Sequence, residues 1–295
     1  MSSPNTFAAP PAADRVRAQA THTYMLTLEY DGARFSGWQR QPGRRTVEGT
    51  LLLAITEVTG ETPALTASGR TDAGAHAHGQ VAGCTLSRAW DCERLRAALN
   101  AHLPEDVTVV SLIAAPAGFH ARFDAIARTY RYVLAPRTRR AVGRQYAWFV
   151  EGDVDVDAMR VAARHVVGTH DFGAFGRSPR PGGTTVRTVH DVEVRMLSMP
   201  EVSALQGAAT PAPARSVVVI DVTADAFLYG MMRALAGALV AVGRGRLEAA
   251  ELAAMLSEGR RPSRAPASAP AHGLHQWRVI YPAAGAAPVT PEFLP

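Results

Sequence analysis

The order in which strands and helices are predicted limits the fold of this chain more than any other feature. Residues 24–30 alternate apolar and polar side chains, which is typical of a half-buried strand. After Thr46, a good N-cap residue, apolar side chains recur at helical spacing until Gly60 ends the pattern. The rest of the first half predicts two strands, a helix that begins after Asp91 and a further strand, over 63–67, 80–86, 91–99 and 107–113.

The second half repeats this order of elements without repeating the residues. Strand, helix, strand, strand, helix, strand is the order of a ferredoxin-like, or RRM-like, unit, in which both helices cover one face of an antiparallel sheet. We therefore predict an α+β protein with two such halves, 22–120 and 121–282, between disordered tails at 1–21 and 283–295. The strands of the second half are predicted at 128–134, 145–150, 186–194, 217–223 and 277–281, its helices at 155–167 (ended by Gly168), 228–242 and 247–256, and mobile loops at 199–214 and 260–271.

Composition narrows the possible chemistry. All 31 basic residues are arginine, so a lysine Schiff base and a P-loop lysine are both excluded. The formal net charge of +5 is compatible with a polyanionic partner, although a GC-rich genome also favours arginine over lysine. Cys84 and Cys92 lack the spacing of a metal site or a disulfide framework. Because no stretch has the length of a membrane span and the first twenty residues do not resemble a signal peptide, we expect a cytoplasmic protein.

One loop presents charged groups between two glycines. Gly69 and Gly74 permit a tight or left-handed backbone on either side of Arg70 and Asp72. Two interpretations remain open from these residues alone. The loop is either a surface turn with an Arg–Asp pair or a device that presents one carboxylate to a substrate.

Arginine is interleaved with aromatic residues in two further segments, 119–123 and 128–132. This mixture suits stacking on unpaired bases with arginine on phosphates, but Tyr130 also fits an inward-facing strand position. The arginine-containing loop 177–187 could clamp a phosphate backbone or simply be solvated. Arg233, in the first turns of a predicted helix, is either solvated or points into a cleft, where it would keep a carboxylate ionised.

Five motifs, spread over roughly 24–282, resemble those of the TruA family, the bacterial tRNA pseudouridine synthases that act on the anticodon stem-loop. Together they are far more specific than any one of them alone. The stretch 228–230 is less polar here than is usual in that family. In chain order the motifs are YDGARFSGWQRQP (30–42), GRTDAGAHAHGQV (69–81), FHARFDAIARTYRY (119–132), DFGAFG (171–176) and the segment that ends at Arg233.

The resemblance implies that the protein isomerises uridine to pseudouridine at positions 38–40 of tRNA, as a homodimer that needs neither cofactor nor metal. It also implies the pseudouridine synthase fold, in which the two ferredoxin-like halves form one long antiparallel sheet with helices packed on it. A basic active-site cleft would lie between the halves. Arg122, in the third motif, is expected to contact the RNA.

Five residues acquire roles from this resemblance. Asp72 would be the catalytic carboxylate, acting either as a nucleophile or on a ribose proton, and Arg233 would pair with it. Tyr130 would stack on the target uracil and take the C5 proton late in the reaction. Arg70 would hold the RNA backbone or fill the space of the flipped nucleotide, and Leu274 would pack beside the base.

Two other functions are compatible with parts of the sequence. A non-catalytic RNA-binding module of two RRM-like halves would show aromatic strings on its sheet face, and strings of that kind are missing. A metal-dependent hydrolase would use Asp72, His76 and His78, since His-x-His on a strand places both rings on one face. No third strong ligand pattern accompanies those histidines, so we predict that they are bystanders.

Overall fold

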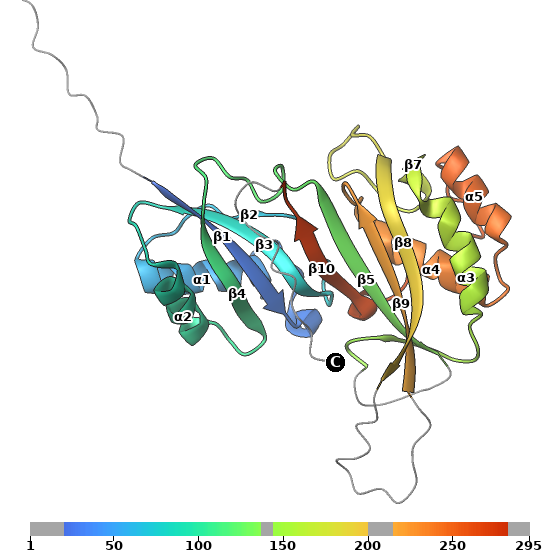
Figure 1. Ribbon diagram of the computed structural model, residues 1–295, viewed down its shortest axis with the longest axis horizontal. Coiled ribbons are helices and arrows are strands. Elements are labelled where there is room, and N and C mark those ends of the chain that lie inside the picture. The colour runs from blue at the N-terminus through green and yellow to red at the C-terminus, as the bar shows by residue number, and fades with distance from the viewer. Residues whose placement is uncertain (1–20, 137–143, 200–214, 283–295) are drawn as a thin grey trace, which may run out of the picture.

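A computed structural model describes residues 21–136, 144–199 and 215–282. Within these ranges ten strands form one sheet, and helices pack against it at both ends of an elongated molecule (Figure 1). The strand order along the sheet is β4-β1-β3-β10-β5-β9-β8-β7, with β2 paired to β3 and β6 paired to β5. The predicted α+β class with a large continuous sheet is therefore confirmed.

The first half of the chain has the predicted ferredoxin-like order of elements. Local signals explain its helix ends, because the Thr46 side chain accepts from the Gly49 amide and Gly60 is left-handed with φ of 75°. The Asp91 side chain likewise accepts from the Arg94 amide at the start of the second helix. The elements are β1 (His22–Tyr30), α1 (Val47–Thr59), β2 (Thr66–Ala67), β3 (His76–Leu86), α2 (Cys92–His102) and β4 (Val107–Ala115).

The second half places its strands in the corresponding order, β10-β5-β9-β8, with a helix after β5 and another after β9. A short strand, a further short strand at the far edge and one additional helix extend this unit. The elements are β5 (Ala127–Pro136), β6 (Trp148–Val150), α3 (Val156–Ala163), β7 (Gly168–Asp171), β8 (Val186–Met199), β9 (Arg215–Ala224), α4 (Met231–Gly243), α5 (Ala249–Glu258) and β10 (Leu274–Ile280).

Several predicted boundaries in this half differ from the observed ones, and three of the differences have a clear physical reason. Helix α4 begins at Met231 rather than at 228, because Gly230 is left-handed (φ of 79°) and ends the preceding turn. Gly168 ends the α3 region as predicted, but it also opens β7, a four-residue strand too short and too polar to show a period. β10 begins at Leu274 rather than 277, because polar residues at its start are buried and hide the apolar alternation. The predicted tails (apart from the exposed residue 21) and most of the predicted loop 199–214 lie outside the described residues.

Strand β10 joins the two halves into one sheet. It pairs antiparallel with β5 and parallel with β3, where His275 lies opposite His76. Since β2 contacts β3 only through Thr66 and Ala67, the other end of β3 is left free for β10. The sheet is thus antiparallel except for the β3–β10 and β5–β6 pairs.

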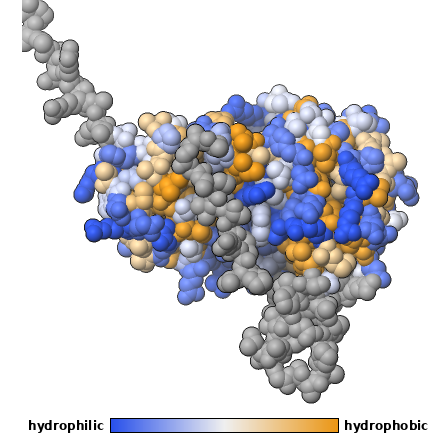
Figure 2. Space-filling model, in the orientation of Figure 1, coloured by the Kyte–Doolittle hydropathy of each residue, from blue (hydrophilic) through white to orange (hydrophobic). Residues whose placement is uncertain are grey.

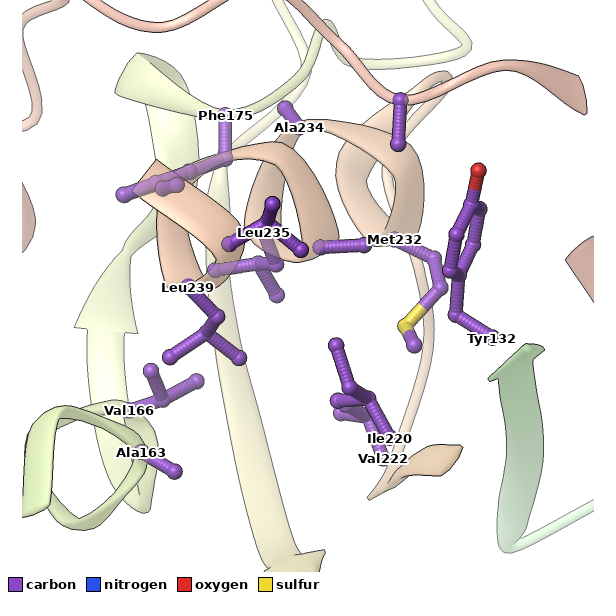
Figure 3. Close-up of a cluster of buried hydrophobic side chains, with 14 of the residues drawn as sticks. Tyr132, Ala163, Val166, Phe175, Ile220, Val222, Met232, Ala234, Leu235 and Leu239 are labelled. Carbon is purple, nitrogen blue, oxygen red and sulfur yellow. The ribbon is translucent and has the colours of Figure 1, made fainter. Parts of the chain in front are cut away.

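Two large apolar clusters lie beneath the helices, one in each half of the sheet. Helix α4 is buried along almost its whole length, which fixes its position on the sheet. At Gly237 a Cβ atom would lie 2.3 Å from the Ala267 carbonyl oxygen, so glycine is needed for segment 265–269 to pack against α4. Figure 3 shows the side chains between α4 and the sheet, among them Tyr132, Ile220, Val222, Met232, Leu235 and Leu239.

Hydrophilic and hydrophobic residues are interspersed over the face of the molecule shown in Figure 2. Over the described ranges, no helix combines the length and the apolar character that crossing a membrane would require. The proposed division of the chain after residue 120 stays a prediction.

Candidate active site

The loop between β2 and β3 carries Asp72, and main-chain contacts hold it in place. The Trp38 amide donates to the Thr71 carbonyl at 3.1 Å, and the Ala75 amide donates to the Asp72 carbonyl at 3.1 Å. The Thr71 hydroxyl lies 2.7 Å from the Tyr30 hydroxyl at the end of β1. The backbone on both sides of the carboxylate is therefore anchored to the rest of the first half.

The two glycines of this loop serve different purposes. Gly74 is left-handed with φ of 81°, as predicted. Gly69 does not have a positive φ, contrary to one reading of the sequence; instead, a Cβ atom there would lie only 3.1 Å from the Tyr130 hydroxyl. Gly69 thus allows the loop to approach a tyrosine from the other half of the chain.

A buried network of polar side chains supports the loop from below. The Ser68 hydroxyl donates to Gln80 Oε1 at 2.6 Å, and Gln80 Nε2 donates to the Gly69 carbonyl at 2.8 Å. Gln276 on β10 donates to both Ser68 Oγ and Gln80 Oε1, each at 3.1 Å. The loop is therefore tied to β3 and to the strand that arrives from the second half.

Asp72 meets Arg233 across the boundary between the halves. Arg233 lies in the first turn of α4, and its Nη1 is 2.9 Å from Asp72 Oδ2. Its Nε donates to the Ala269 carbonyl at 2.7 Å, which aims the guanidinium at the loop. The Asp72 side chain is 14% exposed, so the carboxylate is sheltered but still reachable.

Tyr130 lies on β5 beside this pair, with its ring edge-on to Phe227 at a centroid distance of 4.7 Å. Burial raises the pKa of Tyr130 well above its ordinary value; Arg128 opposes this shift and Asp72 adds to it. The hydroxyl is therefore protonated at neutral pH. The sequence left an inward-facing and a substrate-facing position open for Tyr130, and the ring satisfies both, being 7% exposed at the wall of the cavity.

These groups line a cavity of about 600 Å³ between the two halves. This volume is in the range of sites that hold one small ligand. Arg70, Arg122 and Leu274 also line it, so all of the predicted site residues come together there. Burial lowers the pKa of Arg122, and the neighbouring positive charges lower it further. The cavity wall is thus strongly basic, as a site for a phosphate-bearing ligand requires.

Arg128 is a buried positive charge that the sequence did not single out. Its guanidinium donates to four main-chain carbonyls, those of Ser68, Arg122, Ala125 and Asp225. It therefore joins the Asp72 loop to two other segments of the cavity wall. The signals available in the sequence were two polar residues within predicted strands, namely Arg128 near the start of β5 and Gln80 within β3.

His76 and His78, which follow Asp72, lie on β3 outside the cavity lining. The Gly32 amide donates to His76 Nδ1 at 3.1 Å, and His76 Nε2 lies 2.6 Å from the Gln145 carbonyl oxygen. His78 Nε2 lies 3.2 Å from His275 Nδ1, and burial lowers the pKa of His78 to about 4. In the parts of the chain that the structure describes, no group of three or more His, Cys, Asp or Glu side chains could hold a metal ion, so the geometry gives a metal-dependent hydrolase no support.

Comparison with known proteins gives one consistent result. The family described as tRNA pseudouridine synthase matches residues 27–124 and 162–282. A tRNA pseudouridine synthase A of Methylobacterium radiotolerans is 39% identical over 253 residues, which cover 85% of this chain and 94% of that protein. The Roseiflexus sp. protein of the same name is 40% identical over 88% of this chain and 91% of its own length. That of Caldicellulosiruptor bescii is 33% identical over 87% and 98%. The chain therefore belongs to the tRNA pseudouridine synthase family.

Proposed function

We propose that this protein isomerises uridine to pseudouridine at positions 38–40 of the tRNA anticodon stem-loop, with Asp72 as the catalytic group. The observation that carries the proposal is the sheltered Asp72–Arg233 pair in a basic cavity of about 600 Å³. The name tRNA pseudouridine synthase A, borne by relatives that match most of this chain, supports tRNA as the substrate. The choice of the anticodon arm follows from the resemblance of the five motifs.

The reaction conserves every atom of the nucleotide. The bond between N1 of uracil and C1′ of ribose breaks, the base turns, and C5 forms a new bond to C1′. C5 then loses its proton and N1 gains one. Asp72 acts on the ribose, either as a nucleophile at C1′ or as a base toward a ribose proton, and neither route calls for a cofactor or a metal.

The surrounding residues support the carboxylate and the base. Arg233 neutralises the charge of Asp72 and orients it through the 2.9 Å hydrogen bond. The Tyr130 ring stacks on the target uracil and Leu274 packs beside it, since both line the cavity. Tyr130 would take the C5 proton late in the reaction; because its raised pKa keeps the hydroxyl protonated at neutral pH, the hydroxyl must pass its own proton on as it accepts this one. Arg70 and Arg122 contact the backbone of an RNA whose target nucleotide has left its stack.

The family resemblance also supports a homodimer acting in the cytoplasm, with the chain divided into halves at 22–120 and 121–282. Sedimentation equilibrium of the purified protein should give twice the mass of one chain. A single-chain mass at micromolar concentration would contradict the dimer. This result would leave the catalytic proposal intact, because every residue of the proposed site comes from one chain.

The catalytic proposal is tested by exchanging Asp72 for its amide. Asp72→Asn should lower tritium release from tRNA labelled at uridine C5 by at least about a thousandfold. Binding of tRNA should change by no more than about threefold, because phosphate contacts dominate affinity. Asp106→Asn is a matched control, since Asp106 also pairs with an arginine, Arg45 at 2.7 Å, but lies outside the cavity lining. Turnover by Asp72→Asn at the rate of this control would refute the role of Asp72.

The site of modification is tested separately. Carbodiimide mapping of tRNA from a strain that lacks this protein should show loss of pseudouridine at positions 38–40 and retention elsewhere. Pseudouridine that persists at these positions while another is lost would refute the anticodon-arm assignment but not the chemistry. If no pseudouridine is lost and the purified protein binds tRNA without turnover, the protein is a non-catalytic RNA-binding module.

A further inference from the structure

Tyr229 differs from the other aromatic residues of the cavity in being exposed at its edge. Its side chain is 60% exposed, yet the residue lines the same cavity as Asp72. The Arg177 guanidinium lies 5.6 Å from the centre of its ring, which is within cation–π range. An exposed aromatic ring beside a guanidinium is a surface on which nucleobases stack.

Hydrogen bonds hold the main chain of Tyr229 in a defined position. The Arg177 amide donates to the Tyr229 carbonyl at 3.2 Å, and the Tyr229 amide donates to the Arg177 carbonyl at 3.0 Å. At Gly176 a Cβ atom would lie 2.6 Å from the Leu228 Cβ atom, so only glycine allows this close approach. Tyr229 is therefore part of a two-stranded contact rather than of a single loop.

The same short segment also carries groups of the catalytic site. Two residues before Tyr229, Phe227 contacts the Tyr130 ring at 4.7 Å. Four residues after it, Arg233 holds Asp72 at 2.9 Å. The backbone of Tyr229 thus has a fixed position relative to the carboxylate and to the ring expected to meet the target uracil.

The charge around the cavity favours RNA over a protein partner. Burial has the largest effect in lowering the pKa of Arg122. The positive charges of Arg70, Arg180 and Arg187 lower it further. With Arg177, this makes five arginines in one region. Such a concentration of guanidinium groups matches the phosphates of a nucleic acid strand.

We propose that Tyr229, supported by Arg177, stacks on the base next to the target uridine and holds the RNA while the target nucleotide is turned into the cavity. When a nucleotide leaves its stack, its neighbour loses a stacking partner, and an exposed ring at the cavity edge replaces that partner. The inference rests on the proposed function in that its ligand is the tRNA substrate. It assigns Tyr229 to substrate positioning, not to the chemical step.

The test uses the full-length protein and tRNA in which the modified uridine has first been mapped. Synthetic RNAs then carry an abasic ribose on the 5′ or the 3′ side of that uridine. On intact RNA, Tyr229→Ala should lower kcat/KM about tenfold, while Tyr229→Phe stays within about twofold because it keeps the ring. On the RNA that lacks the stacked base, wild type and Tyr229→Ala should be equally active.

Two further measurements separate stacking from a general loss of structure. Leu53→Ala removes an equally exposed side chain, 60% accessible and outside the cavity lining, and should leave kcat/KM unchanged. With 2-aminopurine beside the target, wild type and Tyr229→Phe should quench its fluorescence on binding, and Tyr229→Ala should not.

The inference is overturned if Tyr229→Ala is fully active on intact RNA, or if it loses the same factor on both abasic RNAs as on intact RNA. Failure of the proposed function looks different. The wild type would then release no tritium, or the mapped uridine would lie outside the anticodon arm. Even without turnover, the fluorescence measurement decides whether a base stacks on Tyr229.

Discussion

Two aspartate–arginine clusters lie on opposite faces of the sheet, and they differ in the number of hydrogen bonds that the carboxylate accepts. Asp221 on β9 accepts two hydrogen bonds from Arg131, at 2.7 and 2.8 Å, and a third from Arg195 at 2.8 Å. Asp72 accepts one side-chain hydrogen bond, from Arg233 at 2.9 Å. Among the described residues, no side chain other than that of Arg233 donates to the Asp72 carboxylate.

The faces themselves follow from strand alternation. Tyr130 and Tyr132 on β5 point toward the helices and the cavity, so Arg131 between them points to the other face. There Arg131 is directly opposite Asp221 and stacks over Trp277 at 3.7 Å. A carboxylate whose two oxygens both accept hydrogen bonds from guanidinium groups stabilises the sheet. A carboxylate with one oxygen that accepts no side-chain hydrogen bond is available to a substrate. The number of donors around each aspartate distinguishes the two roles.

The largest expected effect comes from removing the single partner of Asp72. Arg233→Ala should lower tritium release about a hundredfold or more, because the carboxylate loses its orientation and its compensating charge. Arg195→Ala, which removes one of the two arginines from Asp221, should leave turnover within about twofold, since Arg131 still holds that carboxylate. If both variants lose activity equally, the two clusters are not functionally distinct.

The next effect is on stability, where the Asp221 cluster should matter more than the Asp72–Arg233 pair. Asp221→Ala removes the carboxylate of Arg131 and leaves Arg195 with Glu193 alone, in a site where the Asp221 side chain is only 12% exposed. The free energy of unfolding should fall by about 3 kcal/mol, measured by urea denaturation. Asp72→Ala should cost about 1 kcal/mol, because it breaks one side-chain hydrogen bond instead of three. Equal losses in the two variants would mean that Asp72 is as structural as Asp221.

A smaller effect is expected from the network beneath the Asp72 loop. Gln80→Leu removes the donor to the Gly69 carbonyl and the acceptor of the Ser68 hydroxyl, so the loop should shift and kcat should fall about tenfold with little change in KM. Gln276→Leu is the matched control, because the bonds between Gln80 and the loop survive it. A drop in kcat of the same size in both variants would mean that altered packing, and not the loss of the loop's hydrogen bonds, lowers the activity.

The smallest effect is expected in the pH dependence of stability. Burial lowers the pKa of His78 to about 4 and that of His275 to about 3, on the face that carries Asp221. Because the unfolded chain binds these protons near pH 6.5 and the folded protein does not, stability should fall as the pH drops below 6.5 toward 4. The expected loss is about 1 kcal/mol per histidine by pH 6. His78→Gln should flatten the pH dependence of urea midpoints, and an unchanged slope would contradict this assignment.

Much of the fold was predictable from local signals. The helix caps Thr46 and Asp91 and the left-handed Gly60 act within a few residues of themselves, so the sequence shows them directly. The order of elements likewise predicted two ferredoxin-like units. β7 escaped prediction because it is a four-residue polar strand with no period, and the start of β10 because its polar residues are buried by contacts with distant strands.

The site was predictable only in part. The Asp72 loop and Tyr130 lie in motifs that the sequence displays, and the family resemblance joined them to Arg233. The residues that hold the loop in place could not be inferred in the same way. Gln80 and Gln276 are 196 positions apart in the chain, and Arg128 binds main-chain carbonyls whose positions depend on three separate segments.

Local patterns and motif chemistry were enough to establish the class of the fold and the family, and they predict Asp72 as the reactive carboxylate. The surroundings of Asp72 depend on the tertiary structure. β10 inserts between β3 and β5, the two halves share a cavity, and α4 brings one guanidinium to a carboxylate 161 residues away. The glycine-framed loop became a candidate active site because the second half of the chain contributes its partner and its opposite wall.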